Sequence, residues 1–336
     1  MEHFSIKSGY GEKDVEDFIN AFHDVGEFKP FDFTLTTFWG EAASKAAFAS
    51  ERRYVLLKDG DPIGVFQGLV EKKLFYKNIR AGSTSGNGIA VLPGFSKDIM
   101  CFFLQEILKR ERFSDYSIFT PFSLNLRNFL EKLHYTLYID LTLEMDKIFQ
   151  NMDKKTRNRV RKAEKLGVAV DFDDSLDALK KAYNVISLTS TERLFSTPPW
   201  SYTVSLHESF KRDGCHSIVA SSYGENGDVA SAAHLIGFDR KMVLWQAGST
   251  EEGYKLNAGS FVQAEVIKWS KGHGYLIYDM GGTNPKESIY AGIHRFKSGF
   301  GGSLVTNTHL QRRAFYVPLA ARIHRSIRGF GLKLPV

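Results

Sequence analysis

Lys297 is a single cation between an aromatic residue, Phe296, and the run Ser-Gly-Phe-Gly-Gly that follows it. A lysine carries a compact charge on a long stem, which suits it to meet a phosphate or the oxyanion that develops during acyl transfer. Phe296 offers a ring to a base or an acyl chain, and the glycines let the backbone come close to a ligand. We therefore take Lys297 and Phe296 as candidate catalytic residues, in a turn that follows a strand. The alternative is an ordinary surface lysine at a strand end.

Asp279 lies upstream, at the end of an otherwise apolar strand that runs into Met-Gly-Gly. A carboxylate at this place accepts a proton, pairs with Lys297, or fixes a turn through its own backbone. We include it among the candidate catalytic residues and leave the turn-forming role open.

The stretch 254–260 precedes and opens a helix, and its small residues expose N-terminal amide groups that bind anions or an acyl carbonyl. Its candidate substrate-binding residues are Tyr254, Lys255, Gly259 and Ser260.

A second basic segment, 153–165, contains seven basic residues and two acidic ones. On a helix, its cations fall on common faces, which suits contact with phosphates such as a tRNA backbone. The candidates for anion or tRNA binding are Arg157, Arg159 and Arg161. A solvated charged face explains the same pattern.

The elements around these residues repeat along the chain. The hydrophobic spacing predicts helices at 12–25, 96–113, 175–194 and 259–274, and each half combines helices with an antiparallel run of strands. We therefore expect an α+β protein with two tandem copies of one fold, the first over 1–140 and the second over 141–316. The C-terminal segment 317–336 is expected to complete the first domain.

Charge and cysteine usage narrow the classes of protein. All 38 acidic residues lie at or before Glu287, whereas eight of the 44 basic residues follow it, so an anionic partner is expected. The two cysteines are far apart and lack metal-ligand spacing, which indicates a reducing compartment without a disulfide framework or a metal site. No long apolar run or signal peptide is seen, so we expect a cytoplasmic protein. The basic, amphipathic segment 318–334 either reaches the inner face of a membrane or packs on the first domain.

Three segments in register, 244–269, 274–282 and 292–302, resemble the Fem-type (FemABX) peptidoglycan-bridge aminoacyltransferases. The stretches 137–170 and 33–41, the second with Trp39, are also similar to that family. The resemblance implies two tandem GNAT (acyl-CoA N-acyltransferase-like) domains without the helical arm of some members, each a mixed, mainly antiparallel sheet flanked by helices. It also implies transfer of an activated acyl group to an amine, with the Phe-Lys pair at the catalytic centre.

The resemblance extends the candidate substrate-binding residues to Tyr202 and Trp39, while two family cations are absent. Ala43 and Pro198 occupy their positions, which puts a nucleotide-linked peptidoglycan precursor in doubt; Arg193 is a candidate replacement. The donor is an aminoacyl-tRNA or an acyl-CoA, and the acceptor a small-molecule or lipid-linked amine. No permanently bound cofactor and no metal is implied.

Three functions follow for testing. The first is a Fem-like acyl or aminoacyl transferase of cell-wall or envelope biosynthesis. The second is an N-acyltransferase that depends on acyl-CoA or an acyl carrier. The third is a non-catalytic GNAT-fold protein that binds anionic ligands.

Overall fold

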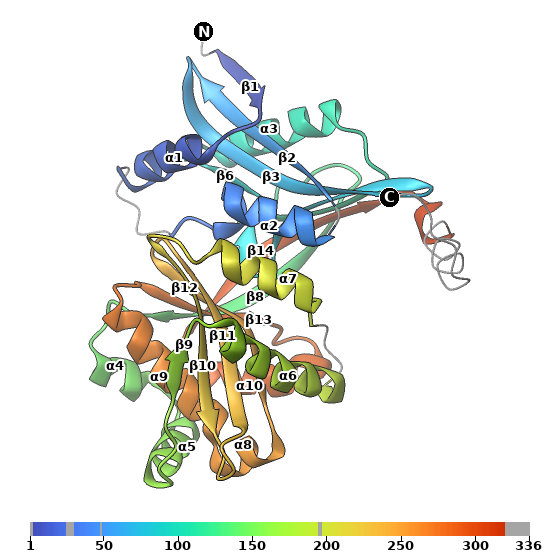
Figure 1. Ribbon diagram of the computed structural model, residues 1–336. Coiled ribbons are helices and arrows are strands. Elements are labelled where there is room, and N and C mark those ends of the chain that lie inside the picture. The colour runs from blue at the N-terminus through green and yellow to red at the C-terminus, as the bar shows by residue number, and fades with distance from the viewer. Residues whose placement is uncertain (1–2, 25–29, 48, 194–196, 320–336) are drawn as a thin grey trace. The chain divides into compact units, whose positions relative to one another are not determined.

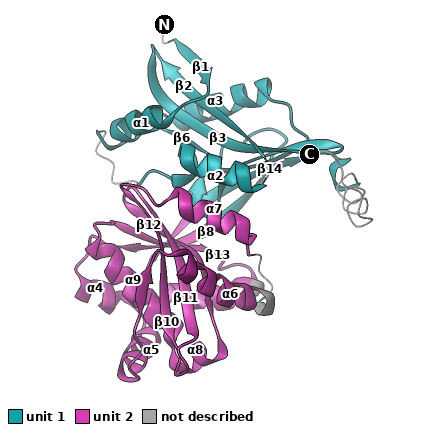
Figure 2. Ribbon diagram, viewed as in Figure 1, with its two compact units in different colours: residues 1–134, 306–336 teal, residues 135–305 magenta. Residues whose placement is uncertain are grey.

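The computed structural model describes residues 3–24, 30–47, 49–193 and 197–319 (Figure 1). These divide into two compact units, unit 1 with Met1–His134 and Thr306–Val336 and unit 2 with Tyr135–Val305 (Figure 2). The expected boundaries were 140 and 316, so the segment that returns to unit 1 begins earlier, at Thr306. The expected amphipathic segment falls largely on 320–336, outside the described residues, as does the side chain of Arg193.

Unit 1 begins with a strand and a helix and then forms an antiparallel run of strands. Its elements are β1 (Phe4–Ser8), α1 (Glu12–Asp24), the 3-10 turn η1 (Phe33–Leu35), α2 (Thr37–Ala47), β2 (Ser50–Lys58), β3 (Asp61–Lys73), β4 (Tyr76–Ser83), β5 (Gly86–Asn87), β6 (Ile89–Val91), α3 (Lys97–Arg110), β7 (Asp115–Thr120) and most of β14 (Ser303–Arg313).

Unit 2 repeats this arrangement with more helices. Its elements are the second half of β8 (Leu130–Asp140), α4 (Met145–Asn151), α5 (Lys154–Lys165), β9 (Asp171–Asp173), α6 (Leu176–Arg193), α7 (Trp200–Ser209), β10 (Cys215–Tyr223), β11 (Val229–Phe238), β12 (Lys241–Ser249), α8 (Glu251–Leu256), α9 (Ala258–Gly272), β13 (Ile277–Thr283), the 3-10 turn η2 (Ser288–Tyr290) and α10 (Ala291–Ser298).

Both units build their sheet on the same plan. Unit 1 has the strand order β1-β2-β3-β4-β7-β14, and unit 2 has β9-β10-β11-β12-β13-β8. In each unit the neighbouring strands are antiparallel except for one pair, β4 with β7 and β12 with β13. A helix joins the strands of each parallel pair, as a parallel connection requires. The predicted tandem α+β fold is confirmed.

Helices cover both faces of the unit 2 sheet. On one face Val262, Val266 and Ile267 of α9 pack in a core with strand residues such as Leu235. On the other, residues of α6 pack against Val219 of β10 and Ala232 of β11. Because side chains alternate along a strand, each residue of β11 faces one helical layer or the other.

Candidate functional site

The parallel pairing of β12 with β13 ends in the middle of both strands. Its rungs are Lys241 with Ile277, Met242 with Tyr278, and Val243 with Asp279. A bulge between Asp279 and Gly282 then bends β13, where Gly281 adopts a left-handed backbone (φ 76°) that only glycine accommodates easily. β12 and β13 are no longer paired beyond the rung between Val243 and Asp279. The candidate catalytic residues Asp279 and Lys297 lie at β13, the first within the strand and the second bonded to its Gly282.

Asp279 is fully buried beside the bulge. Its Oδ1 accepts hydrogen bonds from the Thr136 hydroxyl and, at 2.8 Å, from the Gly281 backbone N–H. Oδ2 has no hydrogen-bond partner among the residues that the structure describes. Burial raises the pKa of Asp279, while the charges of Lys241 and Lys297 oppose that rise. The carboxyl group therefore fixes the bulge, the turn-forming role left open above, and also supplies a negative charge next to Lys297.

Lys297 and Phe296 lie on α10 and not in a turn, so the prediction of a turn at these two residues was wrong. Its Nζ donates a hydrogen bond of 2.8 Å to the Gly282 carbonyl, at the far side of the bulge. Burial lowers the pKa of Lys297 to about 8, and the charge of Asp279 counteracts part of this shift. The residue is partly exposed, yet its ammonium is held in an environment that disfavours the charge. A cation of this kind exchanges its proton near neutral pH.

The glycines after Lys297 dock α10 on its own unit. A Cβ on Gly299 would overlap the Thr156 hydroxyl, and one on Gly301 would overlap the carbonyl oxygen of Asn151. Gly301 also has a left-handed backbone (φ 79°). These glycines were expected to let the backbone approach a ligand. In the structure they let it approach the ends of α4 and α5 and the turn between these helices. These contacts fix where α10 presents Lys297.

Phe296 points into the packing of unit 2. Its ring meets Phe300 edge-on at 5.4 Å between centroids, and it is partly buried against the same core as α9. The structure thus places Phe296 as an anchor of α10, and the ring contact that it makes is with the protein itself.

Helix α8 occupies the segment between β12 and α9, which includes part of the stretch 254–260 that was expected to bind an anion or an acyl carbonyl. Tyr254 and Lys255 are exposed on α8, and the Thr250 hydroxyl caps this helix by accepting from the Gly253 N–H at 3.1 Å. Gly259 and Ser260 lie in the first turn of α9 and are partly or fully buried. The first turn of α8 carries Glu251 and Glu252, which repel phosphate.

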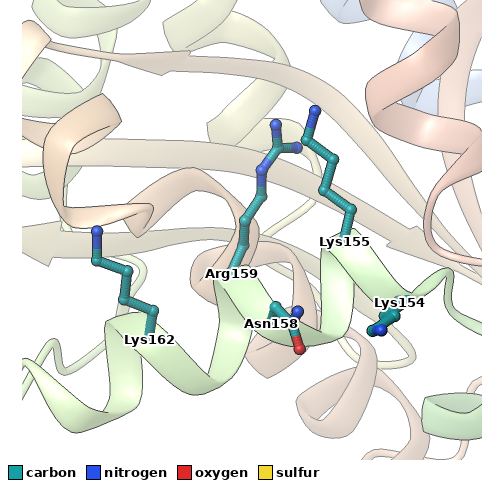
Figure 3. A pocket seen from close by; sticks show the side chains of 5 residues that line it. All are labelled: Lys154, Lys155, Asn158, Arg159 and Lys162. Carbon is teal, nitrogen blue, oxygen red and sulfur yellow. The ribbon is translucent and has the colours of Figure 1, made fainter.

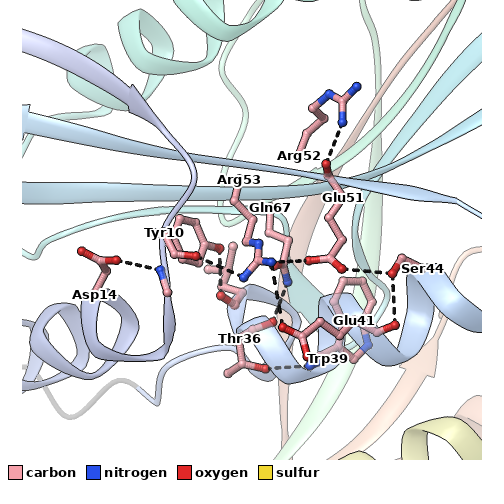
Figure 4. A network of polar contacts seen from close by, with 12 residues as sticks. Tyr10, Asp14, Thr36, Trp39, Glu41, Ser44, Glu51, Arg52, Arg53 and Gln67 are labelled. Atoms are coloured by element: carbon pink, nitrogen blue, oxygen red, sulfur yellow. Dashed lines mark hydrogen bonds and ion pairs between the residues drawn. The ribbon is translucent and has the colours of Figure 1, made fainter.

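Tyr202 and Trp39 lie in different units. Tyr202, on α7, is partly buried and stacks on Trp245 of β12, with 6.4 Å between the centroids. Trp39 of unit 1 is only 3% exposed and packs edge-on against Phe33, inside the polar network of Figure 4. The structure therefore makes Trp39 a core residue of unit 1.

The three arginines of α5 have different surroundings. Arg157 donates to the carbonyls of Gln150 and Met152 and ties α5 to α4. Arg161 lies over the Phe149 ring, 5.3 Å from its centroid. Arg159 lines an open depression along one side of the helix, as Figure 3 shows. Its lining residues are Lys154, Lys155, Asn158, Arg159 and Lys162; we call Lys155, Arg159 and Lys162 the basic stripe.

Two residues near Asp279 were missed in the sequence. Lys241 is 2% exposed, and its charge does most to oppose the effect of burial on the pKa of Asp279. Thr136 donates a hydrogen bond to the Asp279 carboxylate. Lys241 directly follows the turn Asp239-Arg240, where a lysine normally indicates a solvated position. Only the paired strands reveal that it is buried.

Comparison with known proteins fits this geometry. Residues 150–298, which contain Asp279 and Lys297, match the model of the acetyltransferase (GNAT) domain. No curated protein matches the chain. Among solved structures, FemX has 17% sequence identity and a TM-score of 0.69, over 95% of this chain and 100% of its own. The chain has the tandem GNAT fold of the Fem type.

Two further structures share this fold at lower similarity. A tandem GNAT protein from the clavulanic acid biosynthesis pathway has 8% identity and a TM-score of 0.55, over 93% of this chain and 98% of its own. The C-terminal domain of a putative lysylphosphatidylglycerol synthetase from Agrobacterium fabrum has 10% identity and a TM-score of 0.55, over 94% and 96% of the two chains. The expected class, an acyl or aminoacyl transferase, is confirmed at this level by the GNAT domain.

No described helix is long and apolar enough to cross a bilayer. Within the same part of the chain, no group of three or more His, Cys, Asp or Glu side chains is arranged to hold a metal ion.

Proposed function

We propose that this tandem GNAT protein transfers an aminoacyl group from aminoacyl-tRNA to an amine, with Lys297 at the reaction centre. One observation carries the proposal. The Lys297 ammonium is anchored on the Gly282 carbonyl, beside buried Asp279 and past the last β12–β13 rung, within the matched GNAT domain. A donor carbonyl can be held where β12 and β13 are no longer paired, because Lys297, a cation of lowered pKa, lies next to this place.

The chemistry needs few protein groups. The amine nitrogen forms a bond to the donor carbonyl carbon, the ester bond between that carbon and the ribose oxygen breaks, and the amine proton ends on the released hydroxyl. Lys297 stabilises the negative charge that develops on the carbonyl oxygen or on the departing oxygen. Asp279 and Gly282 hold the lysine in place before the reaction begins.

Two features of unit 2 support RNA as the carrier of the acyl group. The basic stripe presents three cations along one side of α5 (Figure 3), and a row of cations is suited to contact with a phosphate backbone. Helix α8 places two glutamates shortly before the first turn of α9, where a CoA pyrophosphate would otherwise bind, and their charge opposes that binding. The resemblance of three segments to the Fem-type aminoacyltransferases points to the same carrier.

For the acceptor we propose a small-molecule or lipid-linked amine of the cell envelope other than the nucleotide-linked precursor. Ala43, at a position where the Fem enzymes carry a lysine, is fully buried on α2 and contributes no charge. A lipid-linked acceptor would place the protein at the inner face of the membrane, and the cytoplasmic location itself stays a prediction.

A second candidate is an acyl-CoA-dependent N-acyltransferase. The match to the acetyltransferase (GNAT) domain favours it, and the first turn of α9 with Gly259 and Ser260 is where CoA would bind. A third, a non-catalytic binding protein, predicts that Lys297→Ala alters affinity without abolishing any turnover.

Ligand-induced thermal stabilisation of the full chain separates these carriers. A ligand at 100 times its Kd stabilises the folded state by about 2.7 kcal/mol, which raises Tm by several degrees. We expect aminoacyl-tRNA to raise Tm, CoA to leave it unchanged, and neutralisation of the basic stripe to abolish the shift. Lys181→Gln serves as the control, because Lys181 is an exposed lysine of α6 and lies outside the stripe. Stabilisation by CoA with none by tRNA would overturn the choice of carrier.

A further inference from the structure

A chain of hydrogen bonds links two buried histidines on the α6–α7 side of the unit 2 sheet. His207 Nε2 meets the backbone carbonyl of Asp174 at 2.9 Å, and its Nδ1 meets the Ser217 hydroxyl at 2.8 Å. The same hydroxyl meets His234 Nε2 at 2.9 Å. Both histidines are fully buried.

The directions of these hydrogen bonds follow from the one group that can only accept. The Asp174 carbonyl accepts, so His207 Nε2 carries the proton. Burial lowers the pKa of His207 and lowers that of His234 to about 3, so both rings are neutral and His207 Nδ1 is an acceptor. The Ser217 proton therefore points to His207, and His234 Nε2–H donates to Ser217. His234 Nδ1 is left as a bare lone pair.

A second buried acceptor without a donor, Gln246 Oε1, belongs to the residue paired with His234. His234 stands directly opposite Gln246 in the β11–β12 ladder, so both side chains face the α6–α7 layer. His234 Nδ1 and Gln246 Oε1 are both buried atoms without a hydrogen-bond partner among the described residues. Two buried acceptors on one face are costly unless a donor reaches them.

The pair also lies next to the point where β12 and β13 part. Gln246 is three positions beyond Val243 on β12, and Gly282, which holds Lys297, is three positions beyond Asp279 on β13. The β11–β12 ladder shifts register between His234 and Leu235, as strands do at sites that re-aim a side chain. Trp245, the residue before Gln246 in β12, stacks on Tyr202 of α7.

We propose that His234 Nδ1 and Gln246 Oε1 bind the N–H groups of a primary amine, as the specificity site for the acceptor of acyl transfer. The inference rests on the proposed function for the role of that amine, while binding itself does not. A primary amine supplies two or three N–H donors, which match two acceptors. A protonated tertiary amine has one N–H donor and a quaternary ammonium has none, so neither can satisfy both acceptors.

The binding test uses full-length protein labelled with 15N in its histidine rings. We expect n-propylamine to shift the Nδ1 resonance of His234 with saturation, while tetramethylammonium, a cation without N–H groups, leaves it unchanged. Equal shifts with both, or no shift with either, would overturn the proposal. This measurement needs no variant and no acyl donor.

The variant Gln246→Leu removes one acceptor while keeping the bulk of the side chain. It should weaken n-propylamine binding about 10- to 100-fold, which equals about 1.4–2.7 kcal/mol. Gln150→Leu, on the exposed surface of α4, is the matched control and should bind as the native protein does. Amine binding without any transfer would refute the proposed function alone. Transfer with an amine KM unchanged in Gln246→Leu would refute this inference alone.

Discussion

Replacing Lys297 with methionine should abolish transfer and yet make unit 2 more stable at pH 7. The structure holds the Lys297 pKa at about 8 against an ordinary value of 10.5, so the charged form is disfavoured in the folded state by about 3 kcal/mol. Methionine keeps the stem and removes this cost, but also loses the hydrogen bond to Gly282, worth about 0.5–1.5 kcal/mol. The expected net gain is about 1.5–2.5 kcal/mol. The expected loss in kcat is about 100- to 1,000-fold, roughly what one such donor contributes.

The sign of this effect depends on pH. Because the folded-state pKa lies below the unfolded one, the unfolded chain binds more protons between about pH 8 and 10. The native protein therefore gains stability as pH rises through that range, and the advantage of Lys297→Met shrinks there.

Urea unfolding followed by tryptophan fluorescence measures this difference, since three of the four tryptophans, Trp200, Trp245 and Trp269, lie in unit 2. The control is Lys268→Met, an exposed lysine of α9 whose replacement should change stability by less than about 0.5 kcal/mol. If Lys297→Met is less stable than the native protein at pH 7, the ammonium is a structural support and the argument fails.

Two more predictions follow from the same geometry. The kcat/KM for transfer should fall as pH rises through about 8, because Lys297 loses its proton there. Asp279→Asn should move this fall to lower pH, because it removes the negative charge that raises the Lys297 pKa. A fall near pH 10 in the native protein would contradict the first prediction. Gly301→Ala should destabilise unit 2 by at least about 1–2 kcal/mol, because its backbone is left-handed and its Cβ would overlap Asn151. Gly272→Ala, with open space around it, should not, and equal melting temperatures for the two variants would refute the docking role of Gly301.

The sequence predicted the fold and singled out Lys297, but it did not predict the helix that carries Lys297 or the contacts of its ammonium. The alternation of helices and strands was sufficient to predict two tandem α+β units, because it is a local feature. The GNAT assignment came from the resemblance of three segments to the Fem-type family. Helix α10 was missed because it is short and has glycines near both ends. The packing role of Gly299 and Gly301 could not be predicted, because it depends on contacts with residues 151–156, which are far away in the chain.

Burial of polar residues was the other feature that local patterns concealed. Lys241 follows a turn, and His234 sits in a run of small and apolar residues, so neither stands out by spacing. Their burial follows from how strands pair: Lys241 forms a rung with Ile277, and His234 one with Gln246. Trp39 shows the converse, since a family resemblance suggested a substrate contact and the structure places it in a core.

Formation of an amide product by the purified full-length protein tests the central claim most directly. Aminoacyl-tRNA and an amine acceptor are incubated with the native protein or with Lys297→Met, and the product is measured by mass spectrometry. We expect the native protein to form the amide and Lys297→Met to form at least about 100-fold less. An amide formed equally fast by Lys297→Met, or no amide from aminoacyl-tRNA with any amine tested, would contradict the account.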